Sequence, residues 1–301
     1  MAKENKKLKI SKNGKKFNII AVCAIIFVLA LFYVPCLWAV AQTFKTRGGW
    51  MEDIVGFPKS ISFSNYGLFF NYFYVNVIKD GVPRHVFFEE TVLNTILFAG
   101  GSALTSFIVK FMISYALYKY KCFKESAIIY TMLILIMNIP LAGGQASSLK
   151  LYHQLGLYDN LFGMWFLKGT GVGFFVLVFY ATFGSIPAET YEAAEIDGAN
   201  RLQLMFKIAM PLLKSTIILF FLTEFIGYWN NYMDILILLP SMPTVGLALF
   251  YFNQATNPPE IAHATVKLTG AFICALPMIV VLIFFGDKLM QNVSITEGVK
   301  G

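Results

Sequence analysis

Charged residues are scarce in this sequence. Asp, Glu, Lys and Arg together make up 14% of 301 residues, whereas soluble domains carry about 25%. Hydrophobic residues account for 57%, and Phe alone occupies 30 positions. This composition excludes an ordinary soluble domain and predicts a protein whose solvent is mostly lipid.

Cysteine and histidine are scarce as well. The four cysteines show no Cys-x-x-Cys spacing, so we expect neither a disulfide framework nor a metal site, and no cofactor is implied. The three histidines, His85, His153 and His263, fall in expected loops without an acid pair or a Ser or Cys partner at useful spacing. An intramembrane enzyme is therefore only a distant alternative.

A phosphate-binding loop is missing too. No stretch fits G-x-x-x-x-G-K-[ST], so we expect no ATP hydrolysis by this chain itself. Pro, Gly and Ser do not gather into a linker, and no internal repeat stands out. The sequence therefore predicts one domain rather than several.

What the sequence does contain is a series of apolar windows about 20 residues long, the length that a helix needs to cross a hydrocarbon core of about 30 Å. Six are present, at Phe17 to Ala41, Thr91 to Tyr118, Ser126 to Ala146, Leu161 to Ser185, Ile208 to Tyr232 and Leu268 to Met290. They are long and continuous, so they predict helices and not barrel strands. The expected fold class is an all-α membrane protein with six transmembrane helices in residues 17–290.

The first window has an alternative interpretation. A basic segment precedes it and Ala39-Val40-Ala41 ends it, which together look like a cleavable signal peptide. Signal peptides have apolar stretches of about 7 to 15 residues, and this stretch is longer. A retained span is favoured.

Basic residues gather on one side of the expected membrane. Seven lysines lie within residues 1–16, and more Lys and Arg follow in the connections after the second and fourth windows. Since cytoplasmic segments keep positive charge, both termini, residues 1–16 and 291–301, are expected inside. The net charge of +7 then favours contact with anionic membrane lipid, and no nucleic acid partner is expected.

The connection at residues 186–210 carries helix start and stop signals. Pro187 suits the first turn of a helix, and Gly198 can end that helix in the left-handed conformation. Asn200 can cap a second helix running from Arg201 to Ile208. The sequence therefore predicts a helix-turn-helix knob in the cytoplasm.

This knob resembles a known motif. Glu192-Ala193-Ala194, three residues, Gly198, nine residues, Ile208, one residue and Met210-Pro211 is similar to E-A-A-x3-G-x9-I-x-L-P of binding-protein-dependent ABC importer permeases, with Met210 in place of Leu. In that family the knob docks on the ATPase. The resemblance assigns ATPase coupling to Glu192, Ala193, Ala194, Gly198, Ile208 and Pro211. The alternative is an ordinary connecting loop.

Four further segments are similar to the second permease of maltose-like and multiple-sugar importers: FPKSISFSNYGLFF, LGLYDN, YWNNYMDILILL and EGVKG. The resemblance implies a type I ABC importer permease, multi-pass in a bacterial or archaeal plasma membrane. It also implies a second homologous permease subunit, ABC ATPase subunits and an extracytoplasmic solute-binding protein as partners. The cargo would be a mono- or oligosaccharide, with a polyamine, phosphonate or amino acid as alternatives.

One acid, Glu224, lies in the middle of a window, where insertion of a charge costs about 2.5 to 3.5 kcal/mol. Helical spacing places Tyr228 and Asn231 on its stripe and Thr223 and Asn230 beside it. We expect this face to line the translocation pathway.

Two further points concern this face. Trp229 is a candidate for stacking on a sugar. Alternatively, Glu224 pairs with Lys110, Lys168 or the partner permease and serves assembly alone.

Two glycine-rich stretches resemble nucleotide sites without fitting them. Leu141 to Gln145, LAGGQ, looks like the signature of ABC ATPases but lies at the end of an apolar window, so we interpret it as a chance match. Gly169, Gly171 and Gly173 lack the preceding strand of a phosphate loop and instead predict close helix packing.

Overall fold

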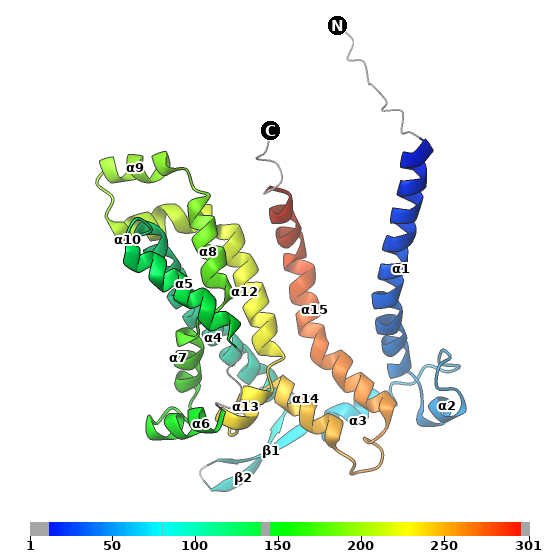
Figure 1. Ribbon diagram of the computed structural model, residues 1–301. Coiled ribbons are helices and arrows are strands. Elements are labelled where there is room, and N and C mark those ends of the chain that lie inside the picture. The colour runs from blue at the N-terminus through cyan, green and yellow to red at the C-terminus, as the bar shows by residue number, and fades with distance from the viewer. Residues whose placement is uncertain (1–11, 80, 140–144, 296–301) are drawn as a thin grey trace. The chain divides into compact units, whose positions relative to one another are not determined.

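The computed structural model describes residues 12–79, 81–139 and 145–295 (Figure 1). The chain forms two compact units. The first comprises Met1–Tyr72 and Thr256–Phe272, and the second comprises Phe73–Ala255 and Ile273–Gly301. The LAGGQ stretch falls mostly on residues 140–144, outside the described part of the chain.

The first unit contains α1 (Lys12–Thr43), α2 (Arg47–Glu52), α3 (Ser64–Tyr72) and the beginning of α15 (Ala264–Ile295). The window Asn18–Thr43 of α1 has a mean hydropathy of 2.8, and 0% of it is buried. Such a helix needs lipid or another subunit around it. The expectation of a first long apolar helix is confirmed.

The connection after α1 is held by a buried lysine. Lys45 is 3% exposed, and its ammonium donates to the carbonyl oxygens of Asp53 and, at 2.9 Å, Gly56. The N–H of Gly56 donates to the Asp53 carboxylate, and this hydrogen bond holds the pKa of Asp53 below its ordinary value. The loop is therefore folded on its own backbone groups.

The second unit begins with a β-hairpin, which corrects the all-α expectation. Strands β1 (Tyr74–Lys79) and β2 (Val82–Phe87) pair antiparallel, with Tyr74 opposite Phe87. Val75, Val77 and Val86 are buried. Their alternation with exposed residues is the period of a strand, and it was missed because the stretch lies outside the long apolar windows.

The remainder of the second unit is helical. Its longer helices are α4 (Phe88–Lys119), α5 (Lys124–Asn138), α6 (Gln145–Gln154), α7 (Leu161–Thr170), α8 (Phe174–Gly184), α9 (Ala188–Ile196), α12 (Lys214–Trp229), α14 (Val245–Gln254) and the later part of α15. Its shorter elements are α10 (Arg201–Gln203), the π-helical turn η1 (Leu204–Ala209), α11 (Met210–Leu212) and α13 (Met233–Leu238).

Some of the six expected windows form single long helices, and others form shorter or bent ones. Within the described residues, three helices are long and apolar enough to cross a membrane, or up to five if each bent pair counts as one span. Helices α1, α4 and α15 confirm the first, second and sixth windows. The third window corresponds to α5, whose 15 residues fall short of the about 20 that a span needs.

Two windows bend where straight helices were expected. The fourth splits into α7 and α8 at an angle of 55°. The fifth, expected from Ile208 to Tyr232, contains an 80° bend between Leu212 and Lys214 and ends as a helix at Trp229. Pro211 lacks an N–H and follows a π-helical turn, and both features deflect a helix.

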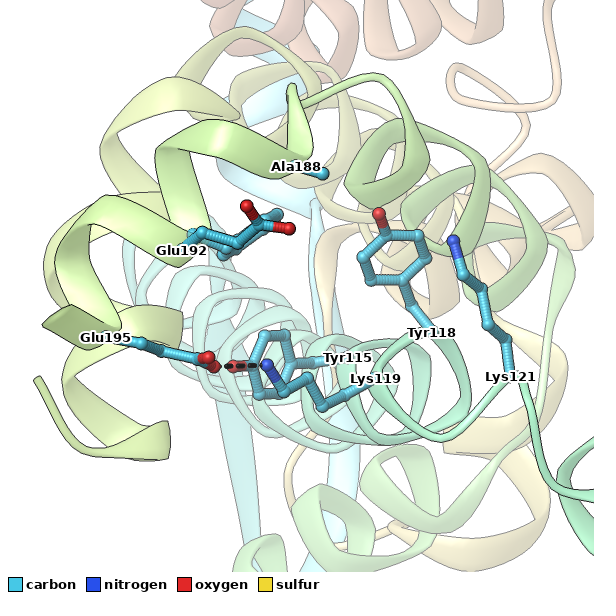
Figure 2. Close-up of a pocket in the computed structure, with 8 residues that line it drawn as sticks. Tyr115, Tyr118, Lys119, Lys121, Ala188, Glu192 and Glu195 are labelled. Carbon is cyan, nitrogen blue, oxygen red and sulfur yellow. Dashed lines mark hydrogen bonds and ion pairs between the residues drawn. The ribbon is translucent and has the colours of Figure 1, made fainter.

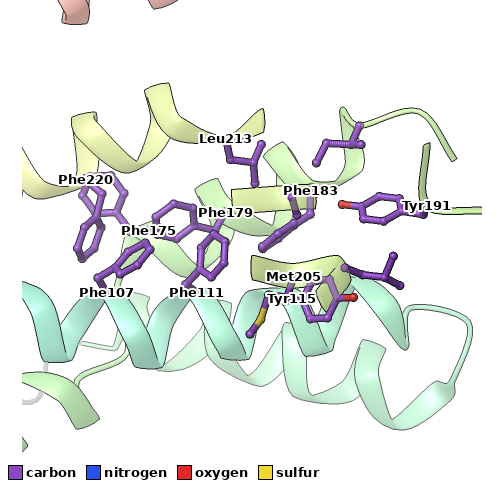
Figure 3. Packing of buried hydrophobic residues seen from close by; sticks show 13 residues of the cluster. Phe107, Phe111, Tyr115, Phe175, Phe179, Phe183, Tyr191, Met205, Leu213 and Phe220 are labelled. Carbon is purple, nitrogen blue, oxygen red and sulfur yellow. The ribbon is translucent and has the colours of Figure 1, made fainter. Parts of the chain in front are cut away.

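A cluster of aromatic side chains forms the core of the second unit (Figure 3). Phe107 and Phe111 of α4 meet Phe179 of α8, with ring centroids 6.0 and 5.4 Å apart. Phe220 of α12 lies 5.5 Å from Phe179. Each buried ring removes a large apolar area from contact with solvent or lipid. The cluster therefore fixes α4, α8 and α12 together.

Small residues bring α4 and the broken pair α7–α8 close together. A Cβ on Gly169 would lie 3.3 Å from Thr105, and one on Gly173 would lie 3.4 Å from the Lys110 ammonium. The predicted role in close packing is confirmed at Gly169. Gly173 makes an ordinary contact with Lys110, and a Cβ on Gly171 would meet only the Lys168 carbonyl oxygen, at 3.5 Å. A Cβ on Gly101 would lie 2.1 Å from the ring of Trp165.

We predict that Gly101→Ala destabilises the protein. The new methyl group must displace the Trp165 ring, whose Nε1 donates to the Leu97 carbonyl oxygen at 3.1 Å, and overpacking of this kind costs about 1 to 3 kcal/mol. The matched control is Gly100→Ala, where nothing lies within 4 Å and helix propensity favours Ala by about 1 kcal/mol. Thermal unfolding of the two purified variants measures the difference. Equal melting temperatures would contradict the prediction.

Candidate functional site

The expected helix-turn-helix knob is present. Helix α9 begins after Pro187 and ends at Ile196, and Gly198 adopts a φ of +83°. The Ala199 N–H donates to the Ala194 carbonyl oxygen at 2.9 Å, which closes the end of the helix. This left-handed position explains the glycine, since other residues adopt it at a cost.

A capping box starts the second helix of the knob. The Gln203 N–H donates to Asn200 Oδ1 at 2.9 Å, and the Asn200 N–H donates to Gln203 Oε1 at 2.8 Å. The cap expected at Asn200 is confirmed. The helix expected from Arg201 to Ile208 is α10 followed by the π-helical turn η1.

The six residues that the resemblance assigns to coupling differ in their exposure to solvent. Glu192, Ala193, Gly198 and Pro211 are exposed. Ala194 and Ile208 are partly buried and pack against the aromatic cluster.

The knob also exposes apolar side chains that the sequence reasoning missed. Ile196 is 85% exposed and Leu202 is 61% exposed. Their apolar character beside polar neighbours, Glu195 and Asp197 around Ile196 and Arg201 and Gln203 around Leu202, was the available signal. An exposed apolar pair of this kind marks a contact surface.

Polar contacts tie the knob to one end of α4. The Lys119 ammonium pairs with the Glu195 carboxylate at 2.5 Å, the Arg201 guanidinium donates to the Tyr120 hydroxyl, and the Tyr115 hydroxyl donates to the Arg201 carbonyl oxygen at 3.3 Å. A movement of the knob therefore acts directly on α4.

A cavity of about 230 Å³ separates α9 from this end of α4 (Figure 2). Glu192 and Glu195 line it from α9, and Tyr115, Tyr118 and Lys121 line it from the other side. The buried Tyr191 ring also lines the cavity, and burial, with smaller contributions from Tyr118 and Tyr115, raises the pKa of its hydroxyl. The phenol is therefore neutral at any physiological pH.

Glu224 lies in a buried ion pair. Its Oε1 is 3.0 Å from the Lys110 ammonium, and the two side chains are 17% and 8% exposed. Lys110 was one of the partners expected for Glu224. The lysine also lies beside Gly173, where the backbone is extended between α7 and α8. Breaks of this kind expose backbone polar groups at membrane depth, and transporters use them at binding sites.

A second ion pair joins Lys168 of α7 to Asp234 of α13. The Lys168 ammonium is 2.5 Å from Asp234 Oδ2 and 5.8 Å from the centre of the Tyr228 ring. Asn231 donates to the same Asp234 oxygen at 2.5 Å and accepts from the Asp234 N–H at 3.1 Å. Asp234 was missed because it follows the polar pair Asn230-Asn231 at the edge of the window.

The expected stripe on the fifth window is interrupted. Because α12 ends at Trp229, Asn231 does not continue the helical row of Glu224 and Tyr228. Thr223 and Asn230 are exposed, and their side chains donate to the carbonyl oxygens of Leu219 and Ile226, both at 2.9 Å.

Trp229 is placed differently from the expectation that its ring is open to a sugar. It is 3% exposed, and its Nε1 donates to the Cys274 carbonyl oxygen of α15 at 3.3 Å. The ring packs inside the unit in this conformation, so we leave Trp229 out of the candidate pathway.

Neither a metal centre nor an enzyme site emerges from the residues that the structure describes. Among them, no group of three or more His, Cys, Asp or Glu side chains is placed to hold a metal ion. His85 contacts Asn76 Oδ1 at 2.6 Å, His153 stacks on Tyr158, and His263 contacts Thr265 Oγ1 at 3.1 Å. These contacts do not form a catalytic arrangement with an acid and a nucleophile.

We predict that removing only one charge of the Lys110–Glu224 pair destabilises the folded protein. Lys110→Met or Glu224→Leu alone leaves a buried charge unpaired and lowers the free energy of unfolding by about 3 to 5 kcal/mol. The double variant removes both charges and recovers most of that loss. Lys59→Met, in the exposed pair with Glu52, is the control and changes little.

Unfolding in mixed detergent micelles measures these values. If either single variant is as stable as the unaltered protein, the pair is not buried as described. If the double variant is stable yet transports poorly, the charges also serve a function beyond assembly.

Comparisons with known proteins identify the family of this chain. The family model described as binding-protein-dependent transport system inner membrane component matches residues 126–294, more than half of the chain. The melibiose/raffinose/stachyose import permease protein MelC of Bacillus subtilis is 26% identical over 293 residues, which cover 95% of this chain and 98% of MelC. The arabinooligosaccharides transport system permease protein AraQ of Bacillus subtilis is 28% identical over 247 residues, 81% of each chain.

A solved structure shares the fold. One chain of a bacterial ABC transporter involved in the import of the acidic polysaccharide alginate superposes with a TM-score of 0.72 at 23% identity, covering 92% of this chain and 98% of that one. The resemblance to importer permeases of the carbohydrate type is thereby confirmed at the level of sequence relatives and fold. This chain belongs to the family of binding-protein-dependent transport system inner membrane components.

Proposed function

We propose that this chain is a membrane-spanning permease subunit of an ATP-driven importer that passes a carbohydrate delivered by an extracytoplasmic binding protein. The observation that carries the proposal is the knob from α9 to η1. Its turn at Gly198 and its cap at Asn200 hold the residues of the importer motif on a folded projection.

Support for a carbohydrate cargo comes from the relatives. MelC and AraQ are named for oligosaccharides, and the alginate transporter has been solved with a pentasaccharide-bound periplasmic protein. Two lysines of the spans pair with acids, Lys110 with Glu224 and Lys168 with Asp234. A charge-balanced route suits an uncharged saccharide better than a polyamine, a phosphonate or an amino acid.

The proposed topology has six spans with both termini in the cytoplasm. Residues 1–16 form the basic inner segment, residues 17–290 the permease domain with its coupling loop at 186–210, and residues 291–301 the inner tail. The bent pair α7–α8 serves as one span, and α5 and α12, with 15 and 16 residues, serve as short third and fifth spans. The basic residues beside the knob support the inner placement.

We assign ATP hydrolysis to separate ATPase subunits, which bind the knob. The segment with Glu192, Ala193, Ala194 and Gly198 would dock on the ATPase. Its exposed residues Glu192, Ala193 and Gly198 would make the contact, and the exposed side chains of Ile196 and Leu202 would add an apolar part. Closure of the ATPases moves the knob, and the pair between Lys119 and Glu195 passes that movement to α4. Alternating access of the spans follows. Ile208 and Pro211 set the angle at which the knob enters α12.

The translocation pathway is proposed along Glu224, Tyr228 and Asn231, with Thr223 and Asn230 beside it and a second homologous permease opposite. Hydroxyl, amide and carboxylate groups along one route provide the hydrogen bonds that a sugar needs. The broken backbone near Gly173 adds further polar groups to the same region.

We predict that Gly198→Val abolishes transport while the protein stays in the membrane. A Cβ at this position meets no atom within 4 Å, so the effect comes from the φ of +83°, which a β-branched residue rarely adopts. Gly198→Asn, which tolerates this conformation, is the matched control and retains most activity.

The measurement is ATP-driven uptake into proteoliposomes that contain the co-encoded subunits. The substrate is the oligosaccharide that the co-encoded binding protein binds. Full uptake by the Gly198→Val variant would exclude the docking role of the knob. A binding protein that binds no sugar in a panel would exclude the carbohydrate cargo.

The topology generates a second prediction. Cys122 is exposed in the turn between α4 and α5, at the end of α4 that carries the knob. A membrane-impermeant maleimide should label it in inside-out vesicles and not in right-side-out vesicles, with Cys122→Ser as the control. Labelling from the outer side would reverse the proposed orientation.

A further inference from the structure

An apolar crevice lies at the turn between α4 and α5. Its volume is about 420 Å³, and it is lined by Ala116, Leu117, Tyr120, Phe123, Glu125, Ser126 and Ile129. The Ser126 hydroxyl donates to the Leu117 carbonyl oxygen at 3.0 Å and closes the floor. Sites for small ligands have volumes of about 300 to 1,000 Å³ and are mostly apolar.

The crevice continues into an exposed apolar row on α5. Ile128, Ile129, Met132, Leu135 and Ile136 are between 49% and 56% exposed. Their spacing places them on one face of the helix. An acyl chain that leaves the crevice can follow this row without meeting a charged side chain.

Two cations neighbour residues that line the crevice, Arg201 beside Tyr120 and Lys124 between Phe123 and Glu125. The Arg201 guanidinium lies 5.4 Å from the centre of the Tyr120 ring and donates to the Tyr120 hydroxyl. Lys124, at the start of α5, is exposed. Among the described residues, neither cation forms an ion pair with an acid. Lys119, by contrast, is already paired with Glu195.

The beginning of α5 adds backbone donors. The residue before the helix is Phe123, whose side chain makes no capping hydrogen bond, so the first N–H groups of α5 are left for an outside acceptor. Glu125 is the acid in this first turn and lines the crevice. Its charge offsets one of the two cations, and the partial positive charge of the helix start adds to the other.

We propose that this crevice binds one anionic phospholipid. Its acyl chain occupies the apolar cavity and the row on α5, and its phosphate lies between Arg201, Lys124 and the start of α5. The choice of an anionic lipid rests on charge complementarity. It also rests on the proposed function, because the knob end then faces the cytoplasmic leaflet, where anionic lipids make the surface potential negative.

This lipid would contact the knob directly through Arg201. Arg201 is the first residue of α10, immediately after the Asn200 cap, and its carbonyl oxygen accepts from Tyr115 of α4. A phosphate held on the guanidinium therefore stabilises the knob against α4. The anionic lipid content of the membrane would in this way modulate ATP-driven transport.

The test uses the transporter assembled with its co-encoded subunits in phosphatidylcholine nanodiscs. A trace of phosphatidylglycerol or of phosphatidylcholine, each with a diazirine on the acyl chain, is photolysed, and cross-links to residues 116–129 are counted by mass spectrometry. Phosphatidylglycerol should label these residues about fivefold or more above phosphatidylcholine, the effect of one basic residue near an anionic surface. Lys124→Gln and Arg201→Gln should each reduce that preference.

Two further variants sharpen the result. Ala116→Trp fills the crevice and should lower labelling by both lipids, whereas Lys214→Gln, an exposed lysine at the start of α12, should change nothing. Equal labelling by the two lipids would mean ordinary annular lipid and overturn the proposal. Labelling of the isolated chain that disappears on assembly would show that another subunit covers the crevice, which also overturns it. If the lipid preference holds while Cys122 is labelled from outside, the orientation fails and the lipid site stands.

Discussion

The ion pair between Lys110 and Glu224 is the constraint around which the second unit is arranged. Neither charge can face lipid without a large cost, so α4 and α12 must meet at these two positions. The lysine also lies against Gly173, which brings the break between α7 and α8 to the same place. Helices α4 and α12 and the break between α7 and α8 are thus held where polar groups are concentrated, and packing elsewhere must accommodate that meeting point.

The aromatic cluster extends this arrangement to the knob. Phe107, Phe179 and Phe220 join α4, α8 and α12, and the same cluster includes Tyr191 of α9 and Met205 of η1. Close-packed interiors are poorly compressible and transmit strain. The knob, which we propose binds an ATPase, therefore shares one packed core with α4, α8 and α12, which we propose move during transport.

The proposed lipid crevice, the knob and the polar groups around Glu224 all meet α4. Tyr120 and Phe123 border the crevice, Tyr115 and Lys119 hold the knob, and Lys110 holds Glu224. Lys110, Tyr115 and Lys119 lie on α4 and Tyr120 follows its last residue, so this helix connects three proposed roles.

Local chemistry made several features predictable from sequence. The long apolar windows of α1, α4 and α15 follow from hydropathy alone. The knob follows from Pro187, Gly198 and Asn200, because each acts on backbone groups only a few residues away. The short hairpin at Tyr74–Phe87 was predictable in principle from its alternation, but six-residue strands give a weak signal beside spans of more than 20 residues.

Tertiary structure decided the rest. Glu224 had several possible partners, and only the packing of α4 on α12 selected Lys110, 114 positions away. The burial of Trp229 against α15 and the pairing of Asp234 with Lys168 are decided in the same way. Sequence by itself determined which segments form apolar helices and where the turn of the knob lies, since those signals act along the chain, whereas the bends in two of the windows were not predicted. Which polar groups meet inside the bundle depends on contacts between distant helices, and helical periodicity does not encode them.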